Sequence, residues 1–61
     1  MTIEWAGYQF DSDSIDDAQL VESADGVAWR VPCLPNPATD YIETTDDGLR
    51  QIRQAVADAS N

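Results

Sequence analysis

The chain has 61 residues, and its twelve aspartate and glutamate side chains against three arginines give a formal net charge of −9. A chain this short forms one small domain with a limited core. With so few cations, we exclude direct binding to nucleic-acid phosphates and to anionic membranes. Hydrophobic residues make up 43% of the chain and fall in periodic segments, which favours a folded domain over disorder.

Residues 2–10 are predicted to form a strand, because apolar and polar residues alternate along them. One phase of the alternation contains Ile3 and Trp5, and the other contains Tyr8 and Phe10. Gly7 lies where the phase changes. This indicates a β-bulge or a sharp bend that returns the aromatic side chains to the core.

Residues 11–17 are a polar, acidic stretch. Ser14 followed by Asp17 resembles a capping box, so a single helical turn is one interpretation and a plain loop is the other.

Residues 18–32 carry the clearest hairpin signal of the chain. Asp25-Gly26 supplies the residues that a tight hairpin turn requires. After this turn, Val27, Trp29 and Val31 alternate with Ala28 and Arg30. Such alternation is typical of a half-buried antiparallel strand.

The prolines at 32, 35 and 37 are predicted to end this strand and to make residues 32–39 a rigid, extended connector. Residues 40–44 are then predicted to form a short last strand. Thr44 or Thr45 caps a helix over residues 46–59, whose first turn is acidic, as the helix dipole favours. The apolar stripe of this helix consists of Leu49, Ile52 and Val56, with Ala55 beside them.

This order of elements predicts a single α+β domain over residues 1–61. An antiparallel sheet of three or four strands lays one face on one C-terminal α-helix. The predicted core consists of Ile3, Trp5, Tyr8, Leu20, Val27, Trp29, Val31, Ile42, Leu49, Ile52 and Val56.

We expect no enzymatic activity, because the chain has no histidine or lysine and its single thiol, Cys33, follows a proline. One cysteine provides neither an intramolecular disulfide nor a zinc site. Cys33 is therefore interpreted as a small, partly buried apolar residue, with an intermolecular disulfide or a reactive thiol as the alternatives. No metal or cofactor is expected.

The acidic stretch invites comparison with an EF-hand calcium loop. Counted from Asp11, several carboxylates fall at ligand positions, but Ile15 takes the fifth position and Asp16 replaces the glycine at the sixth. The flanking segments also lack two helices. Weak surface binding of calcium by clustered carboxylates is therefore the expectation, and a specific site is not.

The first residues lack the basic start of a signal peptide, and no apolar run is long enough to span a membrane. We expect a soluble protein of the cytoplasm. An exposed sheet edge would also support a homodimer, because so short a chain gains stability by pairing.

The charge pattern is the main functional signal. Seven acids precede the first basic residue, Arg30, and a second acidic group precedes the helix. A duplex as long as the roughly 27 Å diameter of such a domain carries about 16 phosphates, of which about half face one partner. The nine net negative charges of this domain are of the same order as the number of phosphates that face one partner. The candidate partner-binding residues are Asp11, Asp13, Asp16, Asp17, Glu22 and Asp25, with Glu43, Asp46 and Asp47 as a second patch.

In size, charge and α+β character, the whole chain resembles the small acidic inhibitors encoded by phages, including anti-CRISPR proteins that act as DNA mimics. The resemblance involves no sequence motif. It implies a non-enzymatic inhibitor whose partner is the basic surface of a DNA- or RNA-binding protein or complex, such as a CRISPR surveillance complex in the host cytoplasm. The alternative is a small structural or accessory domain with apolar contacts, whose acidity serves solubility, for example in a halophilic cytoplasm.

Overall fold

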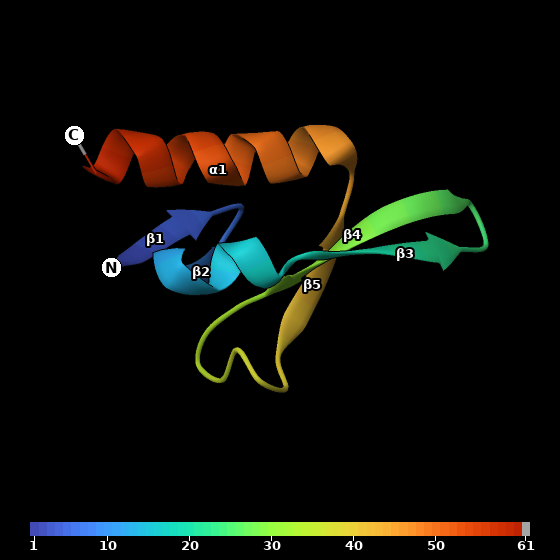
Figure 1. Ribbon diagram of the computed structural model, residues 1–61, viewed down its shortest axis with the longest axis horizontal. Helices are drawn as coiled ribbons and strands as arrows, with labels where there is room; N and C mark the ends of the chain where they lie inside the picture. The colour runs from blue at the N-terminus through green and yellow to red at the C-terminus, as the bar shows by residue number, and fades with distance from the viewer. Residues whose placement is uncertain (61) are drawn as a thin grey trace.

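The computed structural model describes residues 1–60, apart from the side chain of Ser23. The elements are β1 (Thr2–Trp5), β2 (Tyr8–Asp11), the 3-10 helix η1 (Ser12–Asp17), β3 (Gln19–Ser23), β4 (Gly26–Pro32), β5 (Tyr41–Thr44) and α1 (Asp46–Ser60) (Figure 1). The predicted α+β class is confirmed. The predicted antiparallel sheet on the helix is the three-stranded sheet β3-β4-β5, and β1 and β2 form a second, two-stranded sheet that was not predicted.

The first sheet is a hairpin, so the prediction of one strand over residues 2–10 was wrong. Ala6 and Gly7 both have positive φ, at 53° and 83°, and connect β1 to β2 in a two-residue turn. The change of phase at Gly7 thus marks a sharp bend and not a bulge. Ile3 pairs with Phe10, and Trp5 pairs with Tyr8. The apolar residues of both strands therefore lie on one face of the hairpin, although they belong to different phases of the alternation.

The acidic stretch forms η1, so the helical interpretation is the correct one. Its cap is Asp11, whose Oδ1 accepts a hydrogen bond from the Asp13 backbone N–H at 3.0 Å. The capping box predicted at Ser14 is not used. Ile15 is the buried residue of this turn and attaches it to the core.

The second sheet confirms the predicted hairpin. β3 and β4 pair from Gln19–Arg30 to Ser23–Gly26, and Gly26 has a φ of 126°. On the other side of β4, Val31 pairs with Ile42 of β5. Alternate residues of a strand share a face, so this sheet has one face centred on Val31 and an opposite face that carries Arg30.

Residues 33–40 form a compact turn, which corrects the extended connector predicted from the prolines. The Asp40 backbone N–H donates to Asn36 O at 2.6 Å, and the Asn36 N–H donates to an Asp40 carboxylate oxygen at 3.2 Å. The Leu34–Pro35 peptide bond is cis. The Leu34 N–H donates to Gln9 O at 2.8 Å, which joins this turn to the first sheet.

Helix α1 begins where it was predicted to begin. The Thr45 hydroxyl accepts a hydrogen bond from the Gly48 N–H at 3.0 Å, so Thr45 is the N-cap. The helix lies over both sheets, with contacts to β1, β4 and β5. A Cβ at Gly48 would clash with the Thr44 hydroxyl and lie 3.2 Å from the Trp5 ring, so a larger residue there would force these side chains to shift.

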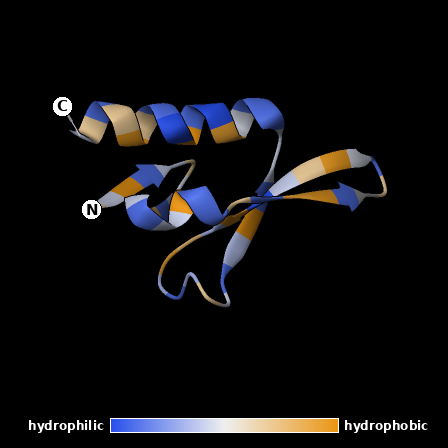
Figure 2. Cartoon of the chain, viewed as in Figure 1, coloured by the Kyte–Doolittle hydropathy of each residue, from blue (hydrophilic) through white to orange (hydrophobic). Residues whose placement is uncertain are grey.

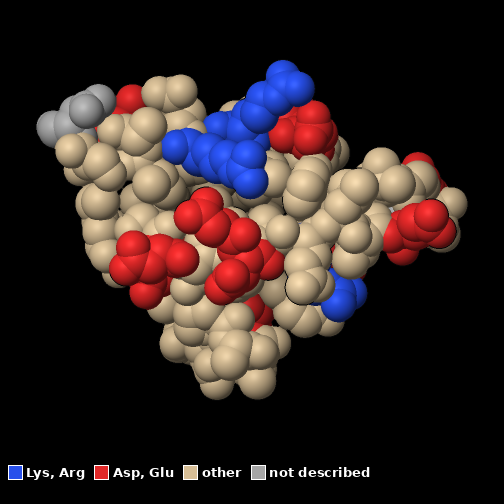
Figure 3. All heavy atoms as spheres, viewed as in Figure 1, with Lys and Arg blue, Asp and Glu red and all other residues tan. Residues whose placement is uncertain are grey.

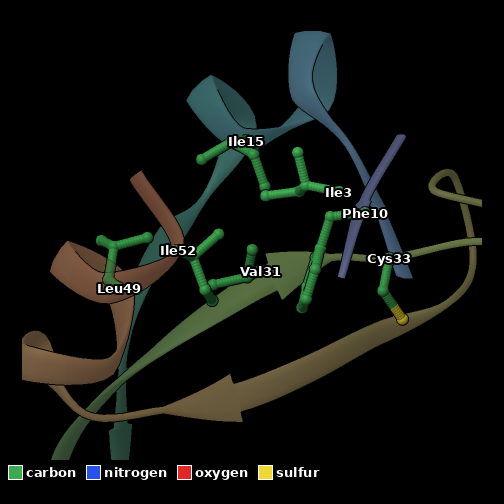
Figure 4. Close-up of a cluster of buried hydrophobic side chains, with 7 residues drawn as sticks. All are labelled: Ile3, Phe10, Ile15, Val31, Cys33, Leu49 and Ile52. Atoms are coloured by element: carbon green, nitrogen blue, oxygen red, sulfur yellow. The ribbon is translucent and has the colours of Figure 1, made fainter. Parts of the chain in front are cut away.

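The core lies between the helix, the two sheets and η1. Its buried side chains are Ile3, Phe10, Ile15, Val31, Cys33, Leu49 and Ile52 (Figure 4). Four other predicted core residues pack partly buried against this cluster, namely Trp5, Trp29, Ile42 and Val56.

Three core predictions were wrong. Tyr8 is 49% exposed, Leu20 57% and Val27 66%. The β3–β4 hairpin projects past the beginning of α1, and its apolar residues extend beyond the cover of the helix (Figures 1 and 2). Phe10 and Ile15 are buried but were missing from the predicted core. Each lies in a segment whose structure the sequence pattern left ambiguous.

Candidate acidic interface

The structure brings together four of the predicted partner-binding residues. Asp11, Asp13, Asp16 and Asp17 lie on or directly before η1, and we call this group the acidic turn. Asp13, Asp16 and Asp17 are exposed, and Asp11 is half-buried. Acidic side chains gather on the surface where η1 lies (Figure 3). Because η1 buries Ile15 in the core, these carboxylates are held by a fixed element and not by a loose loop.

The acidic turn has few internal counter-charges. The chain's amino terminus lies 3.8 Å from Asp11 Oδ1. For Asp13, Asp16 and Asp17, no ion pair occurs within the described residues. Since no opposite charge within 4 Å neutralises these three carboxylates, their field extends into solvent.

Glu22 and Asp25 form a separate acidic site on the projecting hairpin. Glu22 pairs with Val27 in the register of β3 and β4, so it lies on the face of the sheet that carries Val31. Asp25 is in the turn at the hairpin tip. The first predicted patch is thus divided between the acidic turn and the hairpin, because the hairpin extends away from η1 (Figure 1).

The second predicted patch is largely engaged within the fold. An Arg50 guanidinium nitrogen lies 3.2 Å from Asp46 Oδ2, and the Trp29 indole N–H donates to Asp46 Oδ1 at 3.0 Å. The Gln51 amide donates to Asp47 at 3.0 Å. Asp46 and Asp47 therefore help to stabilise the start of α1, where the helix dipole favours anions.

Glu43, the third member of that patch, lies on the opposite face of the sheet from Glu22. It pairs with Arg30 in the register, and the two side chains approach to 3.4 Å. The Arg30 guanidinium also stacks over the Tyr41 ring at 4.2 Å. Glu43 and Glu22 consequently cannot contact one flat partner surface together.

Basic side chains lie beside acidic ones on the face of the molecule that Figure 3 shows. Arg50 pairs with Asp46 across one helical turn, and both side chains are largely exposed. Arg53 makes no ion pair with the described part of the chain. Exposed pairs of this kind contribute little to stability, and they leave most of the negative charge uncompensated.

The sequence analysis missed a shallow hollow on the Arg30 face of the second sheet. Its volume is about 320 Å³. Its lining consists of Asp17, Gln19, Arg30, Pro32, Pro37, Ala38 and Tyr41. The hollow depends on the folding of residues 33–40 against the sheet, and no local pattern in the sequence indicates it.

The described residues contain no group of three or more acidic or thiol side chains arranged to hold a metal ion. Within the same residues, no helix has the length and apolar character needed to cross a membrane. Comparison with protein-family models, with curated proteins and with solved structures finds no match to this chain.

Proposed function

We propose that this protein is a non-enzymatic inhibitor that occupies the cationic groove of a nucleic-acid-binding protein by mimicking the phosphates of DNA. The observation that carries the proposal is the acidic turn, where Asp13, Asp16 and Asp17 are exposed, held by η1 and free of ion pairs within the described residues. A partner with lysine and arginine in its groove would supply the missing counter-charges.

The dimensions of the molecule support the proposal. Its longest extent is 36 Å, and the other two are 23 and 20 Å. A duplex 36 Å long carries about 21 phosphates, of which about half face one side. The net charge of −9, counted over all faces of the molecule, is of the same order as the charge that a groove meets on DNA. A folded mimic also avoids the cost of ordering a flexible ligand.

The class of partner follows from the resemblance to phage-encoded inhibitors. A CRISPR surveillance complex, acting in the cytoplasm of the host, is the partner we propose to test first. Its groove must hold a phosphate backbone, so it presents the basic surface that the acidic turn requires. In this proposal the acidic turn is the principal contact, and Glu22 and Asp25 provide a second one.

The test is displacement of a fluorescent target duplex from the surveillance complex, followed by anisotropy. The wild-type chain should displace the duplex at low salt, and its affinity should fall steeply as sodium chloride approaches about 0.3 M, because exposed charges are screened. The triple substitution Asp13→Asn, Asp16→Asn and Asp17→Asn should weaken displacement by at least about 10-fold, since three charges leave one contact surface.

A matched variant separates the acidic turn from net charge alone. Glu4→Gln, Glu43→Gln and Asp58→Asn together also remove three charges, but from places outside the two proposed contacts. This variant should displace the duplex more strongly than the triple variant of the acidic turn. Equal losses in the two variants, or an affinity indifferent to salt, would contradict mimicry by the acidic turn.

One observation favours the alternative, a small accessory domain with apolar contacts. Leu20 and Val27 are more than half exposed on one face of the projecting hairpin. An apolar contact through this face would not weaken with salt. The salt dependence in the displacement experiment therefore distinguishes the two functions.

A further inference from the structure

The strand β3 is an open edge of the second sheet. In the order β3-β4-β5 it pairs only with β4. Within the described residues, Gln19, Leu20, Val21 and Glu22 make no backbone hydrogen bond on their other side. An unpaired edge of this kind is a template for another strand, and natural proteins usually protect it with charged side chains, proline or a bulge. β3 has no proline or bulge, its pairing with β4 is continuous, and Glu22 is its one charged residue.

The edge also presents an apolar side chain to any strand that joins it. Leu20 pairs with Trp29, so both lie on the face that carries Val31. Trp29 is partly covered, whereas Leu20 is 57% exposed beside the open edge. The hairpin projects past the helix, so no other element covers this part of the face (Figures 1 and 2).

We propose that β3 pairs with β3 of a second copy of this chain, antiparallel across a two-fold axis at Leu20. The two three-stranded sheets then join into one sheet of six strands. Leu20 lies opposite Leu20 of the second copy, and an apolar row continues from Trp29 of one copy to Trp29 of the other. This proposal stands independently of the proposed function.

The position of Glu22 on the edge favours this register over the other two-fold symmetric registers. With the axis at Leu20, the single acid of β3, Glu22, lies opposite Ala18 of the other copy. With the axis at Val21, Glu22 would lie opposite Leu20. With the axis at Glu22, two like charges would be directly opposed, which is unfavourable. Only the register with its axis at Leu20 places an apolar side chain opposite an apolar one and also leaves Glu22 opposite a small neutral residue.

The charge of the whole molecule determines how the dimer responds to salt. Each copy carries −9, so association brings like charges together. Screening of this repulsion should strengthen the dimer as salt rises. Binding to a basic partner would weaken under the same change, so the two interactions are separable by one titration. Pairing of one short strand buries less than the roughly 800 Å² per partner of a standard interface, so the dimer should be a weak one.

Sedimentation velocity of the wild-type chain tests the proposal. At protein concentrations up to about 1 mM we expect a monomer–dimer equilibrium whose dimer fraction increases from dilute buffer to about 1 M sodium chloride. Leu20→Asp should raise the dissociation constant on the order of 100-fold, because both copies lose the leucine at the axis. Tyr8→Asp is the matched control, since it introduces the same charge at another half-exposed apolar residue, on the first sheet and away from the edge. It should change the dissociation constant far less.

Cross-linking tests the register itself. Residues directly opposite in an antiparallel pair have Cα atoms about 4.5–5.5 Å apart, within the range of a disulfide. Leu20→Cys should therefore form a covalent dimer on mild oxidation. Glu22→Cys should not, because the two copies of that residue are about 13 Å apart along the strands. The buried Cys33 of the wild-type chain provides the background. A wild-type chain that stays monomeric at all salts, or preferential cross-linking through Glu22→Cys, would overturn the proposal.

Discussion

Phe10 and Tyr8 share one strand and one face, yet Phe10 is fully buried and Tyr8 is 49% exposed. The difference arises because Phe10 lies opposite Ile3 within the buried core cluster, while Tyr8 lies at the turn end of the hairpin. We expect Phe10→Ala to lose about 3–5 kcal/mol, which is comparable with the whole stability of so small a domain. Near-UV circular dichroism should show Phe10→Ala largely unfolded, and Tyr8→Ala should keep a cooperative melt. If both variants melted alike, the burial of Phe10 would not be what stabilises this hairpin.

The Cys33 thiol makes the free energy of unfolding depend on pH in the alkaline range. Burial, together with the nearby negative charge of Asp40, raises the pKa of the Cys33 thiol above its ordinary value of 9.0. The folded chain then holds the thiol proton more tightly than the unfolded chain does. The stabilisation that comes from the protonated thiol is fully present below about pH 9. It is lost as the pH rises through the raised pKa of Cys33. Urea titrations at increasing pH should show the free energy of unfolding falling less in Cys33→Ala than in the wild-type chain. An identical pH slope in the two proteins would exclude this contribution.

At the scale of elements, the first turn of the chain is strained. Ala6 has a φ of 53°, in a left-handed region that costs an ordinary L-residue about 1–2 kcal/mol. Asparagine adopts this conformation more readily and is favoured before glycine in tight hairpin turns. Ala6→Asn should therefore raise the free energy of unfolding by about 0.5–1 kcal/mol in urea titrations. Ala24→Asn, in the turn of the second hairpin and without a positive φ, is the control and should change it little. A loss of stability in Ala6→Asn would mean that the turn geometry differs.

At the scale of the whole molecule, repulsion among twelve carboxylates destabilises the compact state. Only Arg30, Arg50 and Arg53 oppose them, and each arginine lies in β4 or α1. Salt should therefore raise the melting temperature by screening repulsion. The substitution of Asp13, Asp16 and Asp17 by asparagine should raise the melting temperature in dilute buffer and reduce its dependence on salt. The measurement is a series of thermal melts from dilute buffer to about 1 M sodium chloride. Melts that do not shift with salt would mean that these charges are too far apart to repel.

Much of the candidate interface was predictable from the sequence, because charge is a property of each residue. The acidic stretch was recognised over residues 11–17, and η1 holds its carboxylates as a group. The hydrogen bond from Trp29 to Asp46 was not predictable, since the two residues lie 17 positions apart in the chain. Nor was the separation of Glu22 from Glu43, which depends on the faces of a sheet whose strands are far apart in the chain.

The sequence alone determined the local elements of this protein: the helix from its apolar stripe and threonine cap, the β3–β4 hairpin from its alternation and glycine, and the acidity of its surface. Tertiary structure decided which apolar residues were buried, because burial depends on which elements pack over each residue. It covered Phe10 and Ile15 and left Leu20 and Val27 exposed. It also decided that Gly48 favours a small residue, since α1 packs closely on Trp5 and Thr44 at that position.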